Sequence, residues 1–512
     1  MRARAFSFEV AAAGLLLVGL ALRLAILASP LGEIDGDEAV VGLMARHIAF
    51  SSERPVFYWG QPYLGSLEAF SAAPLFALFD SSTPLLKLVP IVYSLGFLLL
   101  NVLLARRLFG TPPALATGVY LALPPSMWAV WSTKARGGYA EVLFLGQALL
   151  LTSLYLAERH SARLALLWGA IAGVAIWTHL LAAVYVVPTL VYMGLRRRAH
   201  WSISEIACAL GGAFVGALPL IWENVLSGWR SLAALTQAPD LPVDIPAQFV
   251  RFFRIGVPVL VGLGQPTTSE TMFDADWGFR PAGHLSVALI AVALLLLVML
   301  RYVPSVKALV KGESGAAPAL LVFVALAVPP AVAGTRFGFF VSEPRYALPL
   351  YSTVPLLFGA VWSLRPVLRW LAVVGLVVLN VWSLLTTDPR LWRPEDALDS
   401  TAATRSQLVD FLVAQDRHQM YTDYWIGYPI MFETRETVLA YVISGGFNRY
   451  VPPADNVQRT PNPAWVFVPD TLPETMFLDQ LGTVGGQAHI SDIGGYRVYT
   501  DVQPLAAMRP PR

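Results

Sequence analysis

The chain has 512 residues, of which 56% are hydrophobic and only 14% are charged, and its mean hydropathy is +0.58. Soluble globular proteins average about a quarter charged residues, so this composition excludes an ordinary soluble protein and predicts an α-helical polytopic membrane protein. The net charge of +2 is too small, and the arginines are too scattered between apolar runs, to indicate a nucleic-acid partner.

Cys208 is the only cysteine, so the chain can form no internal disulfide and no thiolate metal site. Lysine occurs only at positions 87, 134, 307 and 311, which favours a GC-rich bacterial genome. We therefore expect the lipid bilayer around the chain to be a bacterial plasma (inner) membrane.

Apolar runs define the spans. The first follows Arg2 and Arg4 and is roughly 19 residues long, longer than the core of a cleavable signal peptide, which predicts a retained first helix. Runs near the roughly 20 residues that a membrane-spanning helix needs predict about eleven spans. They are residues 9–29, 85–105, 113–131, 139–157, 164–179, 181–195, 205–222, 284–301, 316–334, 346–364 and 367–386.

Basic residues between these spans set the topology. With a cytoplasmic N-terminus, the arginine and lysine pairs fall on the inner turns, as the positive-inside rule requires. They include Arg106, Arg107, Arg159, Arg163, Arg196, Arg197, Arg198, Arg301, Lys307, Lys311, Arg365 and Arg369. This assignment places residues 30–84, residues 223–283 and everything after Thr387 outside. The 223–283 loop, with Asp274 and Asp276, is a candidate lid.

The composition changes at Asp388, after which no run is long enough to span a membrane. A helical pattern covers residues 402–414, and β-like segments cover 419–422, 438–442, 465–468 and 496–500. We therefore expect a membrane-embedded catalytic module over residues 1–387 and a small extracytoplasmic mixed α/β domain over 388–512.

An acidic cluster, Asp35-Gly-Asp37-Glu38, follows the first span. A charge at the bilayer centre costs roughly 2.5 to 3.5 kcal/mol, so these acids lie at or beyond a membrane surface. Asp35 and Glu38 have the spacing of a helix capping box, which explains both without any chemistry. It does not explain Asp37. Because helix neighbours point about 100° apart, only one of Asp37 and Glu38 can face a small site as the reactive carboxylate.

The residues after this cluster predict a helix that lies in the membrane interface. Val40, Leu43, Met44 and Ile48 fall at helical spacing on one face, while Arg46 and the opposite side are polar. The acids would then lie just above the lipid headgroups.

Aromatic and acidic residues before the second span allow two interpretations. Phe57, Tyr58, Trp59 and Tyr63 match an interfacial aromatic belt, and they could equally stack on a sugar. Glu68 is either a second polar contact at the site or an exposed helix residue.

Lys134 and Arg136 flank a turn on the same outer face that continues through two glycines to Tyr139 and Glu141. The glycines allow a close approach of backbone to a ligand, and positive charge on an outer turn runs against the inside bias. We favour phosphate binding over ordinary snorkelling of the two cations.

Further polar positions lie near the outer ends of spans. Arg345, followed by Tyr346, opens the tenth span and is a second phosphate candidate, with Arg336 a weaker third. His179 between two apolar helices is more often a core histidine than a ligand. Arg23 is expected to snorkel along the first span, with contact to the phosphate as the alternative.

The stretch from Glu33 resembles a known family. The acidic pair followed by Ala, the helix ending in Arg-His-Ile and the following G-Q-P-Y-L-G are similar to the first outer loop of the GT-C superfamily. Within it they resemble the branch of protein O-mannosyltransferases and lipid A aminoarabinose transferases. The likeness covers residues 13–385 and is strongest over 33–70. The family's Lys-Pro-Pro stretch is absent after Tyr63, where this chain has G-S-L-E-A-F.

The resemblance implies a GT-C-like fold and a glycosyltransferase that moves a hexose or pentose from a polyprenyl phosphate to a hydroxyl at the outer face, with inversion in one displacement. It makes Asp37 the general base with Glu38 beside it. Arginines can hold a phosphate by bidentate hydrogen bonds, so no cofactor or divalent metal is required, although metal is not excluded. The predicted phosphate ligands are Lys134, Arg136 and Arg345. The predicted substrate contacts are Asp35, Tyr63, Glu68, Tyr139, Glu141, His179 and Tyr346. The acceptor stays open between protein, lipid and cell-envelope glycan.

Two other functions fit parts of the sequence. A transporter or flippase of polyprenyl-linked lipids or glycans is the main alternative, but transporters usually place ionisable groups near the midplane, whereas this chain keeps its acids on an outer loop. A receptor or scaffold would use the C-terminal residues, which show no binding signature.

Overall fold

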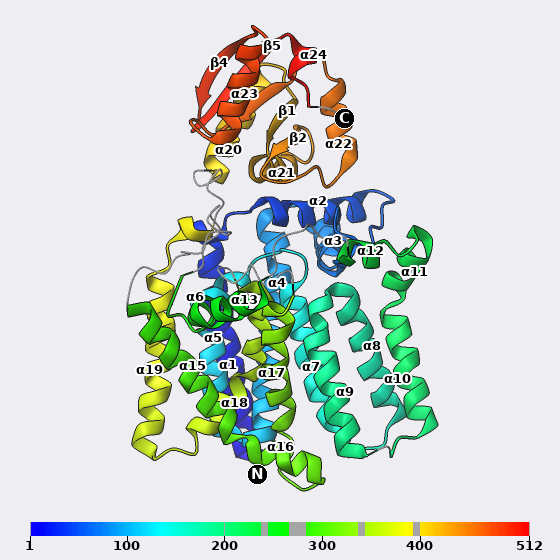
Figure 1. The fold of residues 1–512 in the computed structure, drawn as a ribbon, viewed down its shortest axis with the longest axis vertical. Helices are drawn as coiled ribbons and strands as arrows, with labels where there is room; N and C mark the ends of the chain where they lie inside the picture. The colour runs from blue at the N-terminus through cyan, green and yellow to red at the C-terminus, as the bar shows by residue number, and fades with distance from the viewer. Residues whose placement is uncertain are drawn as a thin grey trace.

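The computed structural model describes residues 2–198, 200–236, 244–265, 283–335, 344–392 and 400–510. A helical bundle forms the larger part, and a smaller α/β unit (residues 400–510, called the C-terminal unit) covers one end of it (Figure 1). The bundle helices are α1 (Arg2–Leu27), α4 (Thr83–Phe109), α5 (Thr111–Ala122), α6 (Ser126–Trp131), α7 (Tyr139–Glu158), α8 (Ala162–Thr178), α9 (Ala183–Arg197), α10 (Ile203–Gly216), α11 (Leu218–Ser227), α15 (Gly283–Arg301), α16 (Val303–Lys311), α17 (Ala319–Ala333), α18 (Val354–Val361) and α19 (Pro366–Leu385).

Shorter elements lie toward the C-terminal unit. They are α2 (Gly36–Phe50), α3 (Leu67–Phe79), α12 (Arg230–Thr236), α13 (Ile245–Arg251), the π-helical η3 (Phe252–Gly256), α14 (Val257–Leu260), and the 3₁₀ helices η1 (Pro30–Gly32), η2 (Leu180–Ala182), η5 (Arg345–Thr353) and η6 (Pro389–Trp392). The candidate lid residues Asp274 and Asp276, and the weaker phosphate candidate Arg336, lie outside the described residues.

Within the described residues, six helices are long and apolar enough to cross a membrane, or seven if α10 and α11, bent by 61°, form one broken span. The predicted count of about eleven is therefore not confirmed, although helical segments occupy each predicted run. Proline accounts for one of the interruptions. The 113–131 run is divided between α5 and α6 at Pro124 and Pro125, which lack the N–H that a continuous helix needs.

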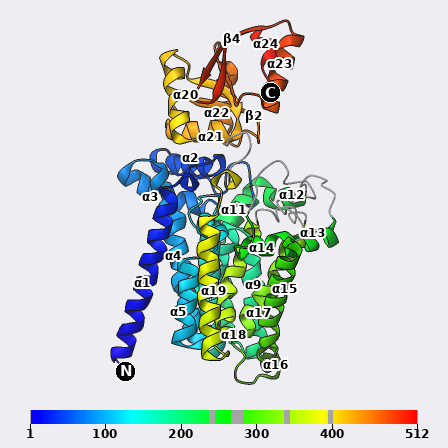
Figure 2. The same ribbon diagram turned by 90° about the vertical axis from the view of Figure 1, so that its left-hand side faces the viewer.

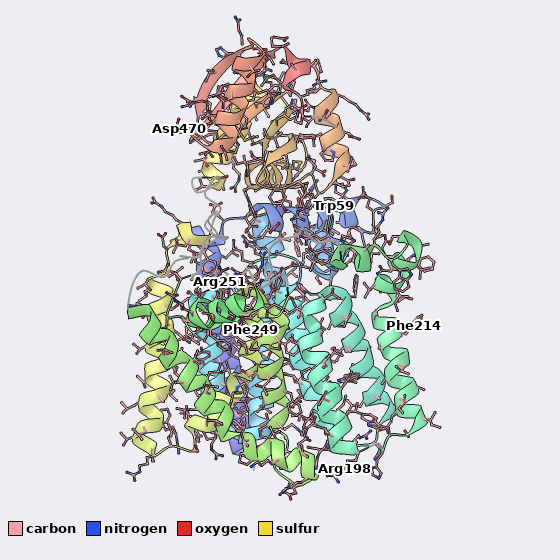
Figure 3. All side chains as sticks on the ribbon, in the orientation of Figure 1. Trp59, Arg198, Phe214, Phe249, Arg251 and Asp470 are labelled. Atoms are coloured by element: carbon pink, nitrogen blue, oxygen red, sulfur yellow. The ribbon has the colours of Figure 1, made fainter. Side chains whose placement is uncertain are left out.

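The flanks of the bundle are apolar, as an integral membrane protein requires. Phe214 on α10 and Trp382 on α19 are 56% and 51% exposed, and Phe214 projects from the side of the bundle in Figure 3. Arg198 lies at the end opposite the C-terminal unit, and its Nη2 donates to the carbonyl of Val310 at 2.9 Å. The N-terminus lies at the same end (Figures 1 and 2).

Helix α2 lies across the other end, beneath the C-terminal unit (Figure 2). The capping box is present, because Asp35 Oδ1 accepts from the backbone N–H of Glu38 at 3.1 Å and Glu38 reaches back to the N–H of Asp35. The predicted apolar face is buried, with Met44 fully inaccessible. The prediction that the opposite face of α2 is polar and turned outward is wrong in part, because helix α21 of the C-terminal unit covers this face. A Cβ on Gly42 would lie 2.5 Å from Cε2 of Phe432 in α21.

The C-terminal unit contains a five-stranded sheet in the order β2-β1-β3-β5-β4. Strand β1 pairs parallel with β2 and β3, whereas β5 pairs antiparallel with β3 and β4. The predicted helix and four predicted strands are confirmed, and β4 and four helices were missed. The elements are α20 (Ala402–Ala414), β1 (Gln419–Asp423), α21 (Tyr424–Glu433), β2 (Leu439–Ser444), α22 (Val451–Arg459), β3 (Ala464–Phe467), α23 (Leu472–Thr483), β4 (Gln487–Ile493), β5 (Tyr496–Gln503) and α24 (Leu505–Met508).

Polar contacts join the C-terminal unit to residues 30–84, and we call this set of contacts the junction. Acids and a histidine come from the 30–84 segment, and most of their partners are arginines or tyrosines of the C-terminal unit. The contacts include Glu33 with Arg405 at 3.2 Å, His47 with Glu436 at 3.0 Å, Glu53 with Tyr450 at 2.7 Å and Asp80 with Arg435 at 2.5 Å, and Asp37 also contacts this unit. Charge complementarity therefore accompanies the apolar packing of α2 on α21.

Replacing Gly42 by valine should loosen this packing, because the new side chain meets the ring of Phe432. Overpacking of this kind typically costs about 1–3 kcal/mol. We expect a lower unfolding temperature, measured in detergent by tryptophan fluorescence. Gly14→Val is the matched control, since no atom lies within 4 Å of a Cβ built there. Equal unfolding temperatures for Gly42→Val and the native protein would contradict this view of the junction.

Candidate functional site

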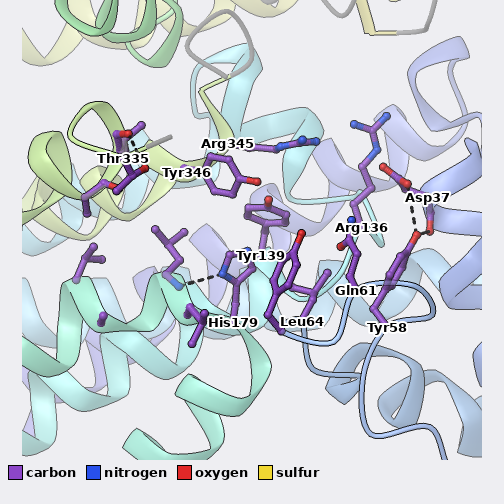
Figure 4. Close-up of a pocket in the computed structure, with 17 residues that line it drawn as sticks. Asp37, Tyr58, Gln61, Leu64, Arg136, Tyr139, His179, Thr335, Arg345 and Tyr346 are labelled. Carbon is purple, nitrogen blue, oxygen red and sulfur yellow. Dashed lines mark hydrogen bonds between the residues drawn. The ribbon is translucent and has the colours of Figure 1, made fainter. Parts of the chain in front are cut away.

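A cavity of about 230 Å³ opens beneath the N-terminal end of α2 (Figure 4). Its walls come from the 58–64 loop, the turn before α7, the start of α9, the end of α17 and the start of η5. It brings together seven of the residues predicted from sequence: Asp37, Tyr63, Arg136, Tyr139, His179, Arg345 and Tyr346.

Asp37 lies in the first turn of α2, where its charge is favoured by the helix dipole. Its Oδ1 accepts a hydrogen bond from the hydroxyl of Tyr424 at 2.7 Å and contacts Nη2 of Arg449 at 3.3 Å. The hydroxyl of Tyr58 lies 3.4 Å from the same oxygen. Burial, and then the charge of Asp37, raise the pKa of both Tyr58 and Tyr424 well above the usual value, so both hydroxyls stay protonated as donors.

Arg136 and Arg345 approach the cavity from different elements, and both guanidinium groups lie near the buried ring of Trp131. Their Cζ atoms lie 5.4 and 5.9 Å from its centroid. Arg136 is also held by Asp35, whose Oδ2 lies 2.8 Å from Nε and 2.7 Å from Nη2. Burial would raise the pKa of Asp35, but Arg136 and Lys134 outweigh it and hold this pKa well below its usual value.

Glu38 and Lys134 do not line the cavity and instead form a buried ion network behind it. Glu38 is fully inaccessible, and its Oε1 accepts from Lys87 Nζ at 2.5 Å and from the backbone N–H of Ala135 at 2.9 Å. Lys134 Nζ lies 2.9 Å from Asp35 and 3.5 Å from Glu38. The network fixes the turn that carries Arg136 against the first turn of α2.

Glu68 also acts on this turn without lining the cavity. Its Oε2 accepts from the backbone N–H groups of Gly137 at 2.7 Å and Gly138 at 3.0 Å, and both glycines have positive φ. Of the two interpretations of Glu68, the exposed helix residue is wrong, because it is only 2% exposed. Glu141, in the first turn of α7, is fully buried.

Aromatic rings form the opposite part of the cavity. The ring of His179 lies 5.1 Å from that of Tyr139 and 6.1 Å from that of Tyr346, between centroids. Nδ1 of His179 accepts from the backbone N–H of Leu181 at 3.0 Å, so this nitrogen caps η2. The snorkelling predicted for Arg23 is wrong: it is fully buried, and its Nε donates to Ser94 at 2.7 Å.

The sequence interpretation missed three residues at the site. Tyr424 and Arg449 come from the C-terminal unit, and no local pattern marks them. Lys87 carried a signal, because a lysine inside an apolar run needs a nearby acid. Among the described residues, no group of three or more His, Cys, Asp or Glu side chains is arranged to hold a metal ion.

The site and the fold can be compared with known proteins. A family model for dolichyl-phosphate-mannose-protein mannosyltransferases matches residues 67–222. The apo structure of ArnT from Cupriavidus metallidurans superposes with a TM-score of 0.57 at 15% identity, and the match covers 100% of this chain and 99% of that one. The protein has the GT-C glycosyltransferase fold. These matches confirm the resemblance to the GT-C superfamily that the sequence predicted.

Two further structures share the GT-C fold. ArnT from the same organism bound to undecaprenyl phosphate gives a TM-score of 0.54 at 15% identity and covers 100% of this chain and 99% of that one. The archaeal oligosaccharyltransferase AglB from Archaeoglobus fulgidus, in complex with an inhibitory peptide and a dolichol-phosphate, gives 0.52 at 12% identity, covering 98% of this chain and 75% of that one. No curated protein matches the chain significantly.

Removing the amine of Lys87 should destabilise the protein, because Glu38 would lose the nearest charge that compensates its burial. Breaking a buried pair from one side typically costs about 3–5 kcal/mol. We expect Lys87→Met to lower the unfolding temperature strongly and Lys87→Met/Glu38→Gln to recover part of the loss. The exposed Lys307→Met is the control. If the double variant is no more stable than Lys87→Met, the pairing is not the source of the effect.

Proposed function

We propose that this protein is an integral-membrane glycosyltransferase that moves a sugar from a polyprenyl-phosphate donor to a hydroxyl acceptor. The GT-C fold and the match to the mannosyltransferase family model support the class of activity. The two similar structures that contain undecaprenyl phosphate and dolichol-phosphate support a polyprenyl-phosphate donor. The acceptor class is a protein, a lipid or a cell-envelope glycan.

The observation that carries this proposal is the shared cavity of one carboxylate and two guanidinium groups. Asp37 takes the proton of the acceptor hydroxyl as general base. The acceptor oxygen forms a bond to the anomeric carbon while the bond from that carbon to the phosphate oxygen breaks. Arg136 and Arg345 hold the departing phosphate with charge-assisted hydrogen bonds. A single displacement inverts the anomeric centre.

The remaining predicted site residues either line the cavity or lie behind it. Tyr63, Tyr139, His179 and Tyr346 line the cavity, where their rings suit the apolar faces of a sugar. Glu38, Lys134 and Asp35 hold the turn carrying Arg136, so the earlier assignments of Glu38 to catalysis and Lys134 to phosphate become positioning roles in this proposal. Glu68 and Glu141 lie behind the same turn.

The distribution of charge supports a proposed orientation in the membrane. The end of the bundle opposite the C-terminal unit carries Arg196, Arg198, Lys307 and Lys311, which matches the positive-inside rule. We place this end and the N-terminus in the cytoplasm of a bacterial plasma membrane. The cavity and a C-terminal domain of residues 388–512 then lie on the extracytoplasmic side of the membrane module of residues 1–387.

Replacing Asp37 by asparagine should remove the general base and leave the cavity intact. General-base catalysis typically contributes about 10²–10⁴-fold, so we expect a loss of transfer of that size with undecaprenyl-phosphate binding retained. Transfer is measured by mass analysis of envelope glycans in a deletion strain carrying each variant. Asp80→Asn is the matched control, since Asp80 pairs with Arg435 away from the cavity. A flippase or scaffold would tolerate Asp37→Asn, and full transfer by this variant would refute the proposal.

Replacing Arg345 by glutamine should weaken phosphate binding, because a hydrogen bond to a charged group contributes about 1.5–3 kcal/mol. We expect the affinity for undecaprenyl phosphate, measured with purified protein in nanodiscs, to fall roughly 10- to 100-fold. Arg365→Gln removes an exposed arginine at the start of α19 and should leave the affinity unchanged. Equal affinities for both variants would exclude Arg345 as a phosphate ligand.

A further inference from the structure

Arg449 lies on the loop between β2 and α22, 412 residues after Asp37 in the chain. Its side chain is only 10% exposed. The guanidinium lies against three aromatic rings, with its Cζ 5.0 Å from the centroid of Tyr58, 5.2 Å from Tyr424 and 4.7 Å from Phe447. This cage fixes the direction in which the charge points.

The guanidinium contacts Asp37 by two routes. Nη2 lies 3.3 Å from Oδ1 of Asp37. Nε donates to the hydroxyl of Tyr424 at 2.7 Å, and this hydroxyl donates in turn to the same Oδ1 at 2.7 Å. Arg449 and Tyr424 therefore both act on one oxygen of the carboxylate, directly and through a relay.

Asp37 differs from the other acids of the junction. Glu33 and Asp80 also pair with arginines of the C-terminal unit, but of these three acids only Asp37 lines the cavity that holds Arg136 and Arg345. The contact between Arg449 and Asp37 therefore joins the C-terminal unit to a residue of the cavity. The ion pairs of Glu33 and Asp80 join it only to residues outside the cavity.

We propose that Arg449 is a positioning residue of the active site, which reaches from the C-terminal unit to hold the Asp37 carboxylate ionised and directed into the cavity. This inference rests on the proposed role of Asp37 as general base. The C-terminal unit then supplies part of the catalytic arrangement, and its docking at the junction is needed for turnover.

Several charged or titratable groups besides Arg449 lie near Asp37, and a test must separate Arg449 from them. They are Asp35 and Glu38 beside it in the chain, Tyr58 from the following loop, Tyr424 from the C-terminal unit, and Arg136 and Arg345 from the cavity wall. Only a substitution at position 449 removes a positive charge on the junction side while leaving the two cavity arginines in place.

The experiment measures the pH at which the Asp37 carboxyl becomes ionised. The full-length protein in detergent is treated with a carbodiimide and an amine, which couple to protonated carboxyl groups, at a series of pH values. Fragment-ion mass spectrometry of the peptide that contains Asp37 separates label on this residue from label on Asp35 and Glu38, and gives the midpoint pH of Asp37 labelling. A neighbouring guanidinium favours the charged carboxylate, so Arg449→Gln should move this midpoint upward by about one pH unit.

Three further variants make the result specific. Arg449→Lys keeps the charge and should restore a midpoint close to that of the native protein. Arg435→Gln removes the junction arginine that pairs with Asp80 and should leave the midpoint unchanged. Tyr424→Phe interrupts the relay and should give a smaller upward shift, which also provides the test if Arg449→Gln does not fold. An unchanged midpoint in Arg449→Gln, or in Tyr424→Phe where only that variant folds, overturns the proposal.

The labelling needs no sugar donor, so its outcome is distinct from that of the transfer measurement. If Asp37→Asn retains transfer, the proposed function fails. If Asp37→Asn loses transfer while the labelling midpoint is the same in Arg449→Gln and the native protein, the proposed function stands and the role of Arg449 fails.

Discussion

The buried pairing of Glu38 with Lys87 is the constraint on which the arrangement of the site depends. A carboxylate with no solvent exposure must have its charge compensated, and Glu38 meets this need with the Lys87 amine and the backbone N–H of Ala135. These contacts bind the start of α2 to α4 and to the turn before α7. Asp37 and Arg136, the neighbours of Glu38 and Ala135 in sequence, are thereby brought to the same cavity. The Glu38–Lys87 pair therefore positions two residues that line the cavity.

The junction explains why so many acids lie between residues 33 and 80. Glu33, Asp37 and Asp80 each contact an arginine of the C-terminal unit, and Glu53 contacts Tyr450. Of these ion pairs, the exposed one between Asp80 and Arg435 contributes little by itself. The packing of α2 against α21 supplies the apolar contact. The acidic loop therefore serves two purposes, since one of its acids faces the cavity and the others orient the unit that covers it.

The sequence predicted the membrane class, the capping box, the apolar runs and much of the C-terminal sheet, because these follow from local periodicity and cap chemistry. It also identified Asp37, Arg136 and Arg345, which now share a cavity. It did not predict that Lys134 faces Asp35, since which side of a turn a cation occupies depends on tertiary packing. The contacts of Tyr424 and Arg449 with Asp37 could not be predicted from the sequence for the same reason. Their relation to Asp37 exists only after two distant segments have packed together.

The separation of Asp37 from these partners along the chain has a consequence for biosynthesis. Tyr424 and Arg449 follow Asp37 by 387 and 412 residues. Every bundle helix has been translated before either of them emerges from the ribosome. A nascent or prematurely terminated polypeptide would thus contain the bundle helices with Arg136 and Arg345, yet lack the two donors from the C-terminal unit that contact Asp37. The order of synthesis keeps the carboxylate without its final partners until the last fifth of the protein has folded.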